Sequence, residues 1–357
     1  MHKLIATSTV LEHEISEFRL LVERQVGVAL DCPNSALAAH AADFMEAHQI
    51  PSSAALLEGL RSPEQDPSLL PAFLDGVLNT NTGFFRHSSA LNALTKQVLP
   101  QLWARKSADG PSPIRIWSAG CATGEETYSI AMAVCEAVSP ANVSVPASGS
   151  GVSQSGKSSA RTGGIAENSA NPSSQAAKLS GACSVHIVGS DLLPGNVEVA
   201  DRGVYLQSAL DGLPPAMIRN YFSKISSPAA SITEIPVDSD MDRRGASNDS
   251  QPAANVAHLL VKPRLRSLVT YNCMNLARPG YIGRFDCIFC MDVLPHFSRA
   301  QRLALLERLH LYLEPGGYLF LSQTEKLAAS NLNFRSETFD GYTFHRKPLA
   351  ASAAYGR

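Results

Sequence analysis

The chain has 357 residues, a formal net charge of −2 and a pI near 6.6. This length favours two domains, and the near-neutral charge gives no support for general nucleic-acid binding. Its apolar runs are shorter than the ~18 residues of a membrane span, and residues 1–6 lack the features of a signal peptide. The seven cysteines, an odd number, favour reduced thiols and a cytoplasmic location.

Residues 1–78 are predicted to form a small all-helical domain. Pro51 and Pro63 divide this region into segments, and apolar residues recur within the segments at helical spacing. The positions that this spacing places on the apolar faces are Phe18, Leu21, Val22, Val26, Leu37, Ala41, Phe44, Met45, Leu56, Leu57 and Leu60.

Residues 79–349 alternate between strand-like and helix-like segments, which is typical of an α/β domain with a doubly wound parallel sheet. The first strand, 114–117, runs into a turn of small residues that includes Gly120 and Gly124, and a helix-like run follows. A strand, a tight turn and a helix N-terminus are the parts of a nucleotide-type cofactor site. Small residues in the turn let the backbone approach the ligand.

The residues around this turn favour one class of ligand. A triphosphate site requires Gly-Lys-Ser/Thr, whereas here Gly124 is followed by Glu125 and Glu126, whose carboxylates would repel phosphate. The Gly-x-Gly-x-x-Gly pattern of dinucleotide sites is only partly present. The two acids instead favour a cationic ligand without phosphate, such as S-adenosylmethionine. A purely structural strand-to-helix turn is the alternative.

Residues 139–181 are rich in Ser, Ala, Gly, Pro and Asn and are predicted to be a disordered insertion. The next predicted strand, 185–190, ends at Asp191. Without the insertion, Asp191 would follow the glycine-rich turn by close to the ~20 residues at which a ribose-binding acid is expected. Asp191 is therefore a candidate ligand of the ribose hydroxyls, and the alternative is an acid that caps the following helix.

A second disordered insertion is predicted at 226–255, within a small β-subdomain at about 205–270. Segments 256–261 and 265–271 could form an antiparallel sheet there, although 267–271 also reads as a strand of the parallel sheet.

The last part of the chain continues the alternation. Strands are predicted at 285–291 and 318–322, and Cys287 and Cys290 in the first of them are interpreted as core thiols. A helix is predicted over 300–313 and stops before the Pro-Gly-Gly that follows. The leucines expected on its apolar face are Leu303, Leu306, Leu309 and Leu313.

Five segments carry a resemblance to a known family. They are N-T-N-T-G-F-F-R (79–86), I-W-S-A-G-C-A-T-G-E-E-T-Y-S-I-A-M (116–132), S-D-L-L-P-G-N-V-E-V-A-D-R-G-V-Y (190–205), F-D-C-I-F-C-M-D-V-L-P-H-F (285–297) and L-E-P-G-G-Y-L-F-L-S-Q-T-E (313–325). From about Glu17 to Arg346 the chain resembles the CheR family of chemotaxis receptor glutamate O-methyltransferases. The resemblance implies a class I S-adenosylmethionine-dependent methyltransferase domain with a small β-subdomain, preceded by a small helical domain.

The resemblance also implies which residues form the site, and it implies no metal. Arg86 could hold a carboxylate of the cofactor or of the substrate in a two-pronged grip. Arg86 is expected to be catalytic, and so is His296, which is expected at the active-site rim. The family's cofactor contacts fall here on Thr80, Thr82, Arg86, Gly120, Glu126, Asp191, Asn275, Leu276, Met291 and Asp292.

The chain departs from the family at several places, which include the string Ser322-Gln323-Thr324-Glu325, where the family has G-H-S-E, and the connection lengthened by residues 226–255. Two further departures bear on the substrate. In the family string R-N-V-x-x-Y-F, Asp292 replaces Asn and His296 replaces Tyr, so His296 is either a retuned substrate contact or an imidazole that fills the rim. Residues 35–48 contain no Arg or Lys, where the family carries an arginine cluster that meets the receptor. Recognition of an acidic receptor surface through this helix is therefore not expected.

The function implied by the resemblance is methyl transfer from S-adenosylmethionine to glutamate carboxylates. The expected substrates are chemoreceptors or receptor-like sensory proteins in the cytoplasm, without nucleic acid and without insertion of this chain into a membrane. Two alternatives stay open. One is a methyltransferase that acts on another protein or a small molecule, and the other is a non-catalytic scaffold or sensor that binds the cofactor.

Overall fold

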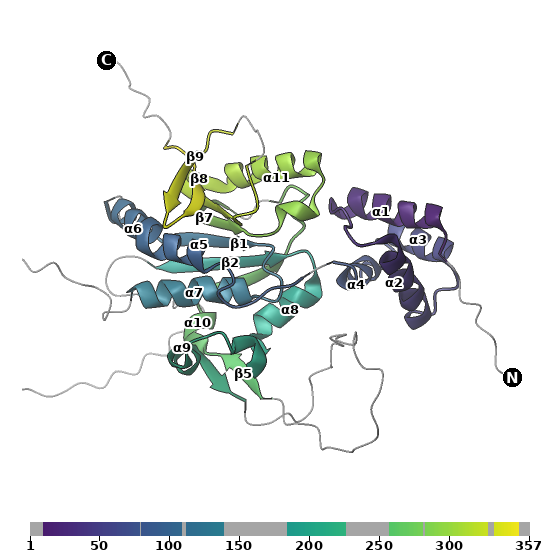
Figure 1. Ribbon diagram of the computed structural model, residues 1–357, viewed down its shortest axis with the longest axis horizontal. Helices are drawn as coiled ribbons and strands as arrows, with labels where there is room; N and C mark the ends of the chain where they lie inside the picture. The colour runs from purple at the N-terminus through teal and green to yellow at the C-terminus, as the bar shows by residue number, and fades with distance from the viewer. Residues whose placement is uncertain are drawn as a thin grey trace, which may run out of the picture.

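A computed structural model describes residues 10–78, 80–108, 112–138, 184–225, 257–280, 283–327 and 332–349. Four N-terminal helices lie beside a layered α/β body that carries a second, smaller sheet (Figure 1). The insertions predicted at 139–181 and 226–255 lie outside the described residues.

The N-terminal helices form where the apolar spacing predicts them. They are α1 (Glu12–Val26), α2 (Asn34–Ala47), α3 (Ser53–Arg61) and α4 (Leu69–Asp75). Gly27 ends α1 because its φ of 76° is left-handed, and its N–H donates to Glu23 O at 2.9 Å. Ser52 caps α3 by accepting the N–H of Ala55 at 3.2 Å. Every residue that the spacing places on the apolar faces is buried.

The main sheet has seven strands in the order β6-β2-β1-β7-β8-β10-β9. Five strands are parallel, and the last two form an antiparallel hairpin at one edge. Since β2 and β7 flank β1, the order reverses at β1, which confirms the doubly wound fold. Ligands of such sheets bind beyond the carboxyl ends of the strands at this point. The strands are β1 (Ile114–Ala119), β2 (Val185–Asp191), β6 (Val269–Cys273), β7 (Phe285–Cys290), β8 (Leu313–Leu321), β9 (Arg335–Phe339) and β10 (Tyr342–Arg346).

The two faces of this sheet have separate hydrophobic cores, because successive side chains of a strand point to opposite faces. Ile116 and Phe289 lie in the core shared with the helices of one face, which are α5 (Ser88–Ala93), η1 (Leu94–Val98), α6 (Leu99–Ala108) and α7 (Glu125–Val138). Trp117 and Ile288 lie in the other core, with α11 (Arg299–Tyr312) and the N-terminal helices. The N-terminal helices therefore share one continuous core with the sheet.

Helix α11 confirms the helix predicted over 300–313 but corrects its apolar face. Leu303 is 38% exposed, whereas Leu305 is 1% exposed and takes its place beside Leu306 and Leu309. Leu313 is buried as the first residue of β8. The buried face of α11 is therefore rotated about the helix axis, by part of a turn, from the predicted face. Cys287 and Cys290 are buried in β7, as interpreted from the sequence.

The small sheet is antiparallel, with the order β3-β5-β4. It contains residues 258–261 of the segment predicted at 256–261, but the prediction that 265–271 joins this sheet is wrong. Val269–Cys273 instead pairs in parallel with β2 and so adds one strand to the edge of the main sheet. The strands of the small sheet are β3 (Val204–Leu206), β4 (Phe222–Lys224) and β5 (His258–Val261). The helices in this part of the chain are α8 (Pro194–Arg202), η3 (Gln207–Leu210), α9 (Pro215–Tyr221) and α10 (Pro263–Arg266).

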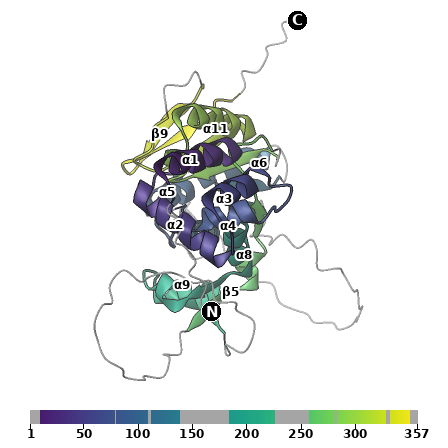
Figure 2. The ribbon, with the colours of Figure 1, turned by 90° about the vertical axis from the view of Figure 1, so that its right-hand side faces the viewer.

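The linker between α1 and α2 is joined to the α/β body beyond β7. Val28 forms an isolated antiparallel bridge with Phe297, and the N–H of Ala29 donates to His296 O at 2.7 Å. Arg278 Nη2 donates to Gln25 O at 2.9 Å on the same side. Figure 2 shows the N-terminal helices in front of the sheet from this direction. They therefore lie at the carboxyl-end edge of the parallel strands.

Helix α7 and the residue before β2 reach the side of the sheet where the parallel strands begin. Helix α7 runs back from the carboxyl end of β1 and ends at Val138. Ser184 lies directly before β2, and Val185 pairs with Ile114 at the start of β1. Val138 and Ser184 therefore both lie at the amino ends of the strands.

Candidate active site

The glycine-rich turn leaves β1 with a strained backbone that only small residues allow. Gly120 and Gly124 have φ values of 81° and 96°, in the left-handed region that favours glycine. A Cβ on Gly120 would lie 2.5 Å from Cγ2 of Val293, so a side chain there would push the turn away from β7. The N–H groups of Gly120 and Cys121 donate to Ser190 O at 2.8 and 2.9 Å, which ties the turn to β2.

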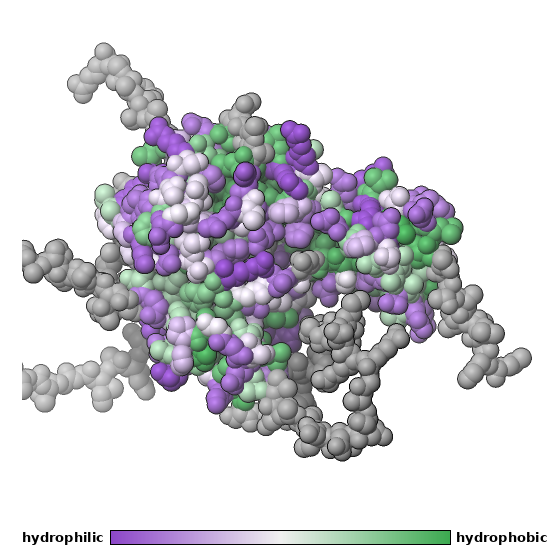
Figure 3. All heavy atoms as spheres, in the orientation of Figure 1, coloured by the Kyte–Doolittle hydropathy of each residue, from purple (hydrophilic) through white to green (hydrophobic). Residues whose placement is uncertain are grey.

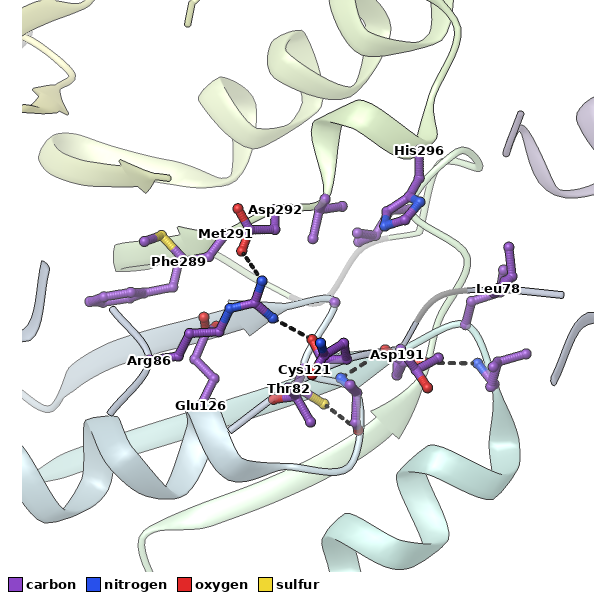
Figure 4. Close-up of a pocket in the computed structure, with 18 of the residues that line it drawn as sticks. Leu78, Thr82, Arg86, Cys121, Glu126, Asp191, Phe289, Met291, Asp292 and His296 are labelled. Carbon is purple, nitrogen blue, oxygen red and sulfur yellow. Dashed lines mark hydrogen bonds and ion pairs between the residues drawn. The ribbon is translucent and has the colours of Figure 1, made fainter. Parts of the chain in front are cut away.

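The two acids after the turn have different roles. Glu125 is turned back into the loop, where its carboxylate accepts the hydroxyl of Thr123 at 2.7 Å, and it does not line the cavity. Glu126 lines the cavity and accepts the hydroxyl of Ser118 at 2.7 Å (Figure 4). Burial raises the pKa of Glu126 to about 7, against the lowering effect of the Ser118 hydrogen bond. A cationic group of a ligand would supply the charge that favours its ionised form.

Asp191 at the end of β2 faces the same cavity and is held by the backbone around it. Its Oδ2 accepts the N–H of Ala122 at 2.9 Å, and its Oδ1 accepts the N–H of Leu193 and the side-chain amide of Asn196, both at 3.0 Å. These bonds orient the carboxylate toward the space beside the turn. Oδ1 already accepts two hydrogen bonds, whereas Oδ2 accepts one and keeps acceptor capacity for a hydroxyl group of a ligand.

The segment before α5 brings Arg86 over the cavity. The ring of Phe84 packs edge-on against Tyr205 and Phe222 of the small sheet, with centroids 5.0 and 5.6 Å apart. The next residue, Phe85, has a φ of 55° and donates its N–H to Ser129 Oγ at 2.9 Å. This sharp turn directs Arg86 away from the small sheet and toward the end of β7.

Asp292 meets Arg86 at the rim of the cavity. Its Oδ2 lies 3.2 Å from Arg86 Nη2 and 3.1 Å from His87 Nε2. The side chains of Arg86 and Asp292 are 44% and 36% exposed, so this ion pair is open to water. The pKa of His87 is lowered because its burial outweighs the attraction of Asp292. Figure 4 shows the guanidinium of Arg86 directed toward the carboxylate of Asp292, with a dashed line between them.

Glu325, beyond β8, fixes the turn that carries Asp292. Its carboxylate accepts the N–H groups of Asp292, Leu294 and Ser322 at 3.2, 2.9 and 2.9 Å. Burial raises the pKa of Glu325, and these three hydrogen bonds act in the opposite direction. Asp292 has a φ of 57° within this turn, so its orientation is set by the backbone.

The remaining predicted residues complete the walls. Asn275 forms a local turn by accepting the N–H of Ala277 at 2.8 Å, and Leu276 follows it. Met291 lies at the end of β7 and is buried. His296, in η4 (Leu294–His296), stands apart from Arg86 and Asp292 in Figure 4.

The fold brings all these residues together around one cavity of about 230 Å³. Its lining includes every residue predicted for the site, namely Thr80, Thr82, Arg86, Gly120, Glu126, Asp191, Asn275, Leu276, Met291, Asp292 and His296. That these residues bind a cofactor or act in catalysis remains a prediction.

The site also includes residues that were not predicted, and four of them show why. His87 stands directly after Arg86, so its position in the sequence could have suggested it. Glu325 acts through backbone groups, for which the sequence gives no spacing signal. Val28 and Leu78 line the cavity from the N-terminal region, and only the docking of the helices brings them there.

In the described parts of the chain, no helix is both long and apolar enough to cross a membrane.

Comparison with known proteins agrees with this geometry. The family model described as "CheR methyltransferase, SAM binding domain" matches residues 80–180 and 247–342, which is more than half of the chain. Chemotaxis protein methyltransferase 1 of Pseudomonas aeruginosa is 27% identical over 87% of this chain and 89% of its own length. Chemotaxis protein methyltransferase of Vibrio parahaemolyticus is 25% identical over 89% and 91%. The chain therefore belongs to the CheR family and is an S-adenosylmethionine-dependent methyltransferase.

Proposed function

We propose that this enzyme methylates glutamate side chains of chemoreceptors or receptor-like sensory proteins in the cytoplasm, giving glutamate methyl esters. The observation that carries the proposal is the position of Arg86, which is the only Arg or Lys among the described residues that line the cavity. A guanidinium matches the planar geometry of a carboxylate. The names of the relatives, which are chemotaxis protein methyltransferases, support the same class of substrate.

The residues present fit S-adenosylmethionine. The carboxylate of Glu126 lies in the cavity with a raised pKa, so a ligand with positive charge and no phosphate suits it. Asp191 offers acceptor capacity for ribose hydroxyls, and Thr80, Thr82, Asn275 and the backbone near Gly120 line the rest of the cavity. When bound, the cofactor supplies an electrophilic methyl group on a sulfonium.

The chemistry needs no general base from the protein. A glutamate carboxylate has a reference pKa of ~4.3 and is already ionised near pH 7. The task of this chain is to strip water from that carboxylate and to orient it, for which Arg86 is suited. Orientation of a bound nucleophile can contribute roughly 7–11 kcal/mol in favourable cases. We propose that His296, which lines the same cavity apart from Arg86, contacts the substrate chain.

The N-terminal helices give no basic surface for receptor recognition. Helix α2 contains no Arg or Lys, and residues 10–78 hold eleven Asp and Glu against three Arg. Hydrophilic and hydrophobic side chains are mixed on the face of these helices shown in Figure 3. We therefore propose that recognition of an acidic receptor surface does not run through α2.

The test is transfer of labelled methyl groups from S-adenosylmethionine to membranes of the source organism, followed by mild base. Methyl esters release methanol in base, whereas N-methyl groups do not, so a base-labile label on a receptor-sized band is expected. Arg86→Ala should lose this label, and Arg299→Ala, an exposed arginine at the start of α11, should keep it.

Two results would contradict the proposal. A base-stable label would indicate a methyltransferase with a different acceptor. Binding of S-adenosylhomocysteine without transfer to any protein would indicate a binding module.

A further inference from the structure

Asp292 presents a carboxylate to the same guanidinium that the proposed reaction needs. Its Oδ2 lies 3.2 Å from Arg86 Nη2, and His87 Nε2 lies 3.1 Å from the same oxygen. An acidic side chain that enters to bind Arg86 therefore finds that group already in contact with a carboxylate of the protein.

The position of Asp292 is built into the fold. The turn after β7 holds Asp292 at a φ of 57°, and the N–H groups of Asp292 and Leu294 both donate to the buried carboxylate of Glu325. The guanidinium of Arg86 is also held through its second terminal nitrogen, because Nη1 donates to Asn81 O. The contact is thus formed by two anchored side chains.

The charge of the cavity makes this contact consequential. The described lining holds three carboxylates, Glu126, Asp191 and Asp292, and Arg86 is its single Arg or Lys. An anionic substrate is repelled by this set unless Arg86 is available. Since Arg86 and Asp292 are 44% and 36% exposed, their pair is weak enough for a ligand to displace.

We propose that Asp292 determines substrate specificity by competing with the acidic side chain of the substrate for Arg86. This inference rests on the proposed function, since it treats Arg86 as the group that receives the substrate carboxylate. Asp292 thereby sets a threshold of binding free energy that any carboxylate must exceed in order to bind Arg86. Only a glutamate whose surrounding chain makes further contacts with the enzyme displaces it, so free acids and isolated peptides are rejected.

The test compares Asp292→Asn with the wild type in the full chain loaded with S-adenosylhomocysteine. Phenylglyoxal modifies arginine, and mass spectrometry of the peptide that contains Arg86 gives the rate at that residue. Glutarate, which carries the carboxylate of a glutamate side chain, should protect Arg86 from modification. The glutarate concentration that halves the rate should be about two- to fivefold lower in Asp292→Asn, as expected from loss of an exposed ion pair.

A matched control is available in the turn between β9 and β10. Asp340 is exposed, has a φ of 47° and does not line the cavity, so Asp340→Asn makes the same chemical change in a similar backbone. Asn is tolerated in this region, so both variants should fold. Equal protection by glutarate in the wild type and Asp292→Asn would overturn the inference, as would an equal gain in Asp340→Asn.

The result also separates this inference from the proposed function. If wild-type enzyme labels no receptor, the proposed function fails, and the glutarate comparison still decides whether Asp292 competes for Arg86. If it does label receptors, Asp292→Asn should lower the KM for an isolated glutamate peptide about two- to fivefold. An unchanged KM for that peptide would overturn the inference and leave the proposed function intact.

Discussion

Replacing Glu126 by Gln should weaken cofactor binding and at the same time stabilise the empty protein. Burial raises the pKa of Glu126 from its ordinary value of 4.5 to about 7. A cationic ligand requires the ionised form, so binding should release a proton below pH 7. With a pKa of about 7, the ionised fraction falls about tenfold between pH 8 and pH 6, and the apparent Kd should rise by a similar factor.

The effect on stability has the opposite direction. A carboxyl group whose pKa is raised on folding keeps its proton longer in the folded state, so stability is lost as pH rises from 4.5 to about 7. Above pH 7 the cost is constant at about 3 kcal/mol, because Glu126 is then ionised in both the folded and the unfolded state. Glu126→Gln removes this cost, and its free energy of unfolding at pH 8 should exceed that of the wild type. At pH 4.5 the two proteins should be nearly equal.

Calorimetric titration with S-adenosylhomocysteine at pH 6 and pH 8, in buffers of different ionisation enthalpy, measures both affinity and proton release. Urea unfolding of the empty protein at the same pH values measures stability. Glu125→Gln is the matched control, since Glu125 does not line the cavity, and it should keep the pH dependence of binding. Wild-type affinity with an unchanged pH dependence in Glu126→Gln would refute the reasoning.

Three further predictions follow from the contacts around the cavity. Asp191→Asn should weaken S-adenosylhomocysteine binding at least tenfold in the same titration, because an amide cannot accept hydrogen bonds from both the ligand and the turn with two oxygens; an affinity within twofold of wild type would contradict the assignment. Tyr205→Phe removes the hydroxyl that donates to Thr123 O at 2.7 Å and keeps the packing of the ring, so it should weaken S-adenosylhomocysteine binding severalfold. A change in the free energy of unfolding without a change in this affinity would show that the hydroxyl has a structural role only. Glu325→Gln replaces one acceptor oxygen by an amide nitrogen that cannot accept, so at least one of three backbone N–H groups loses its partner, and the free energy of unfolding in urea should fall by about 1–3 kcal/mol. An unchanged midpoint would show that water replaces these bonds.

The sequence predicted the features that depend on local pattern. The strand–turn–helix at 114–128 and the end of β2 at Asp191 follow from hydrophobic periodicity and glycine positions. The face of α11 was misjudged at Leu303, because four leucines at nearly helical spacing allow more than one buried stripe. Residues 265–271 were ambiguous, since a short apolar strand does not reveal which of two sheets it will join.

The site itself was predictable where a motif carried it and unpredictable where tertiary packing made it. Arg86 and Glu126 lie in recognisable strings, and the fold does bring them to one cavity. The contact of Arg86 with Asp292 depends on the turn at Phe85 and on the clamp at Glu325, neither of which leaves a spacing signal. Val28 reaches the cavity only through its bridge to Phe297, which is distant in sequence.

The places of Val138 and Ser184 in the fold bear on how the enzyme could be attached to a reporter or a support. Both residues lie where the parallel strands begin, on the far side of the sheet from the cavity. A fluorescent reporter or an affinity module joined to the chain at either residue would therefore start far from Arg86. Attachment on that side is expected to leave the entrance to the cavity clear.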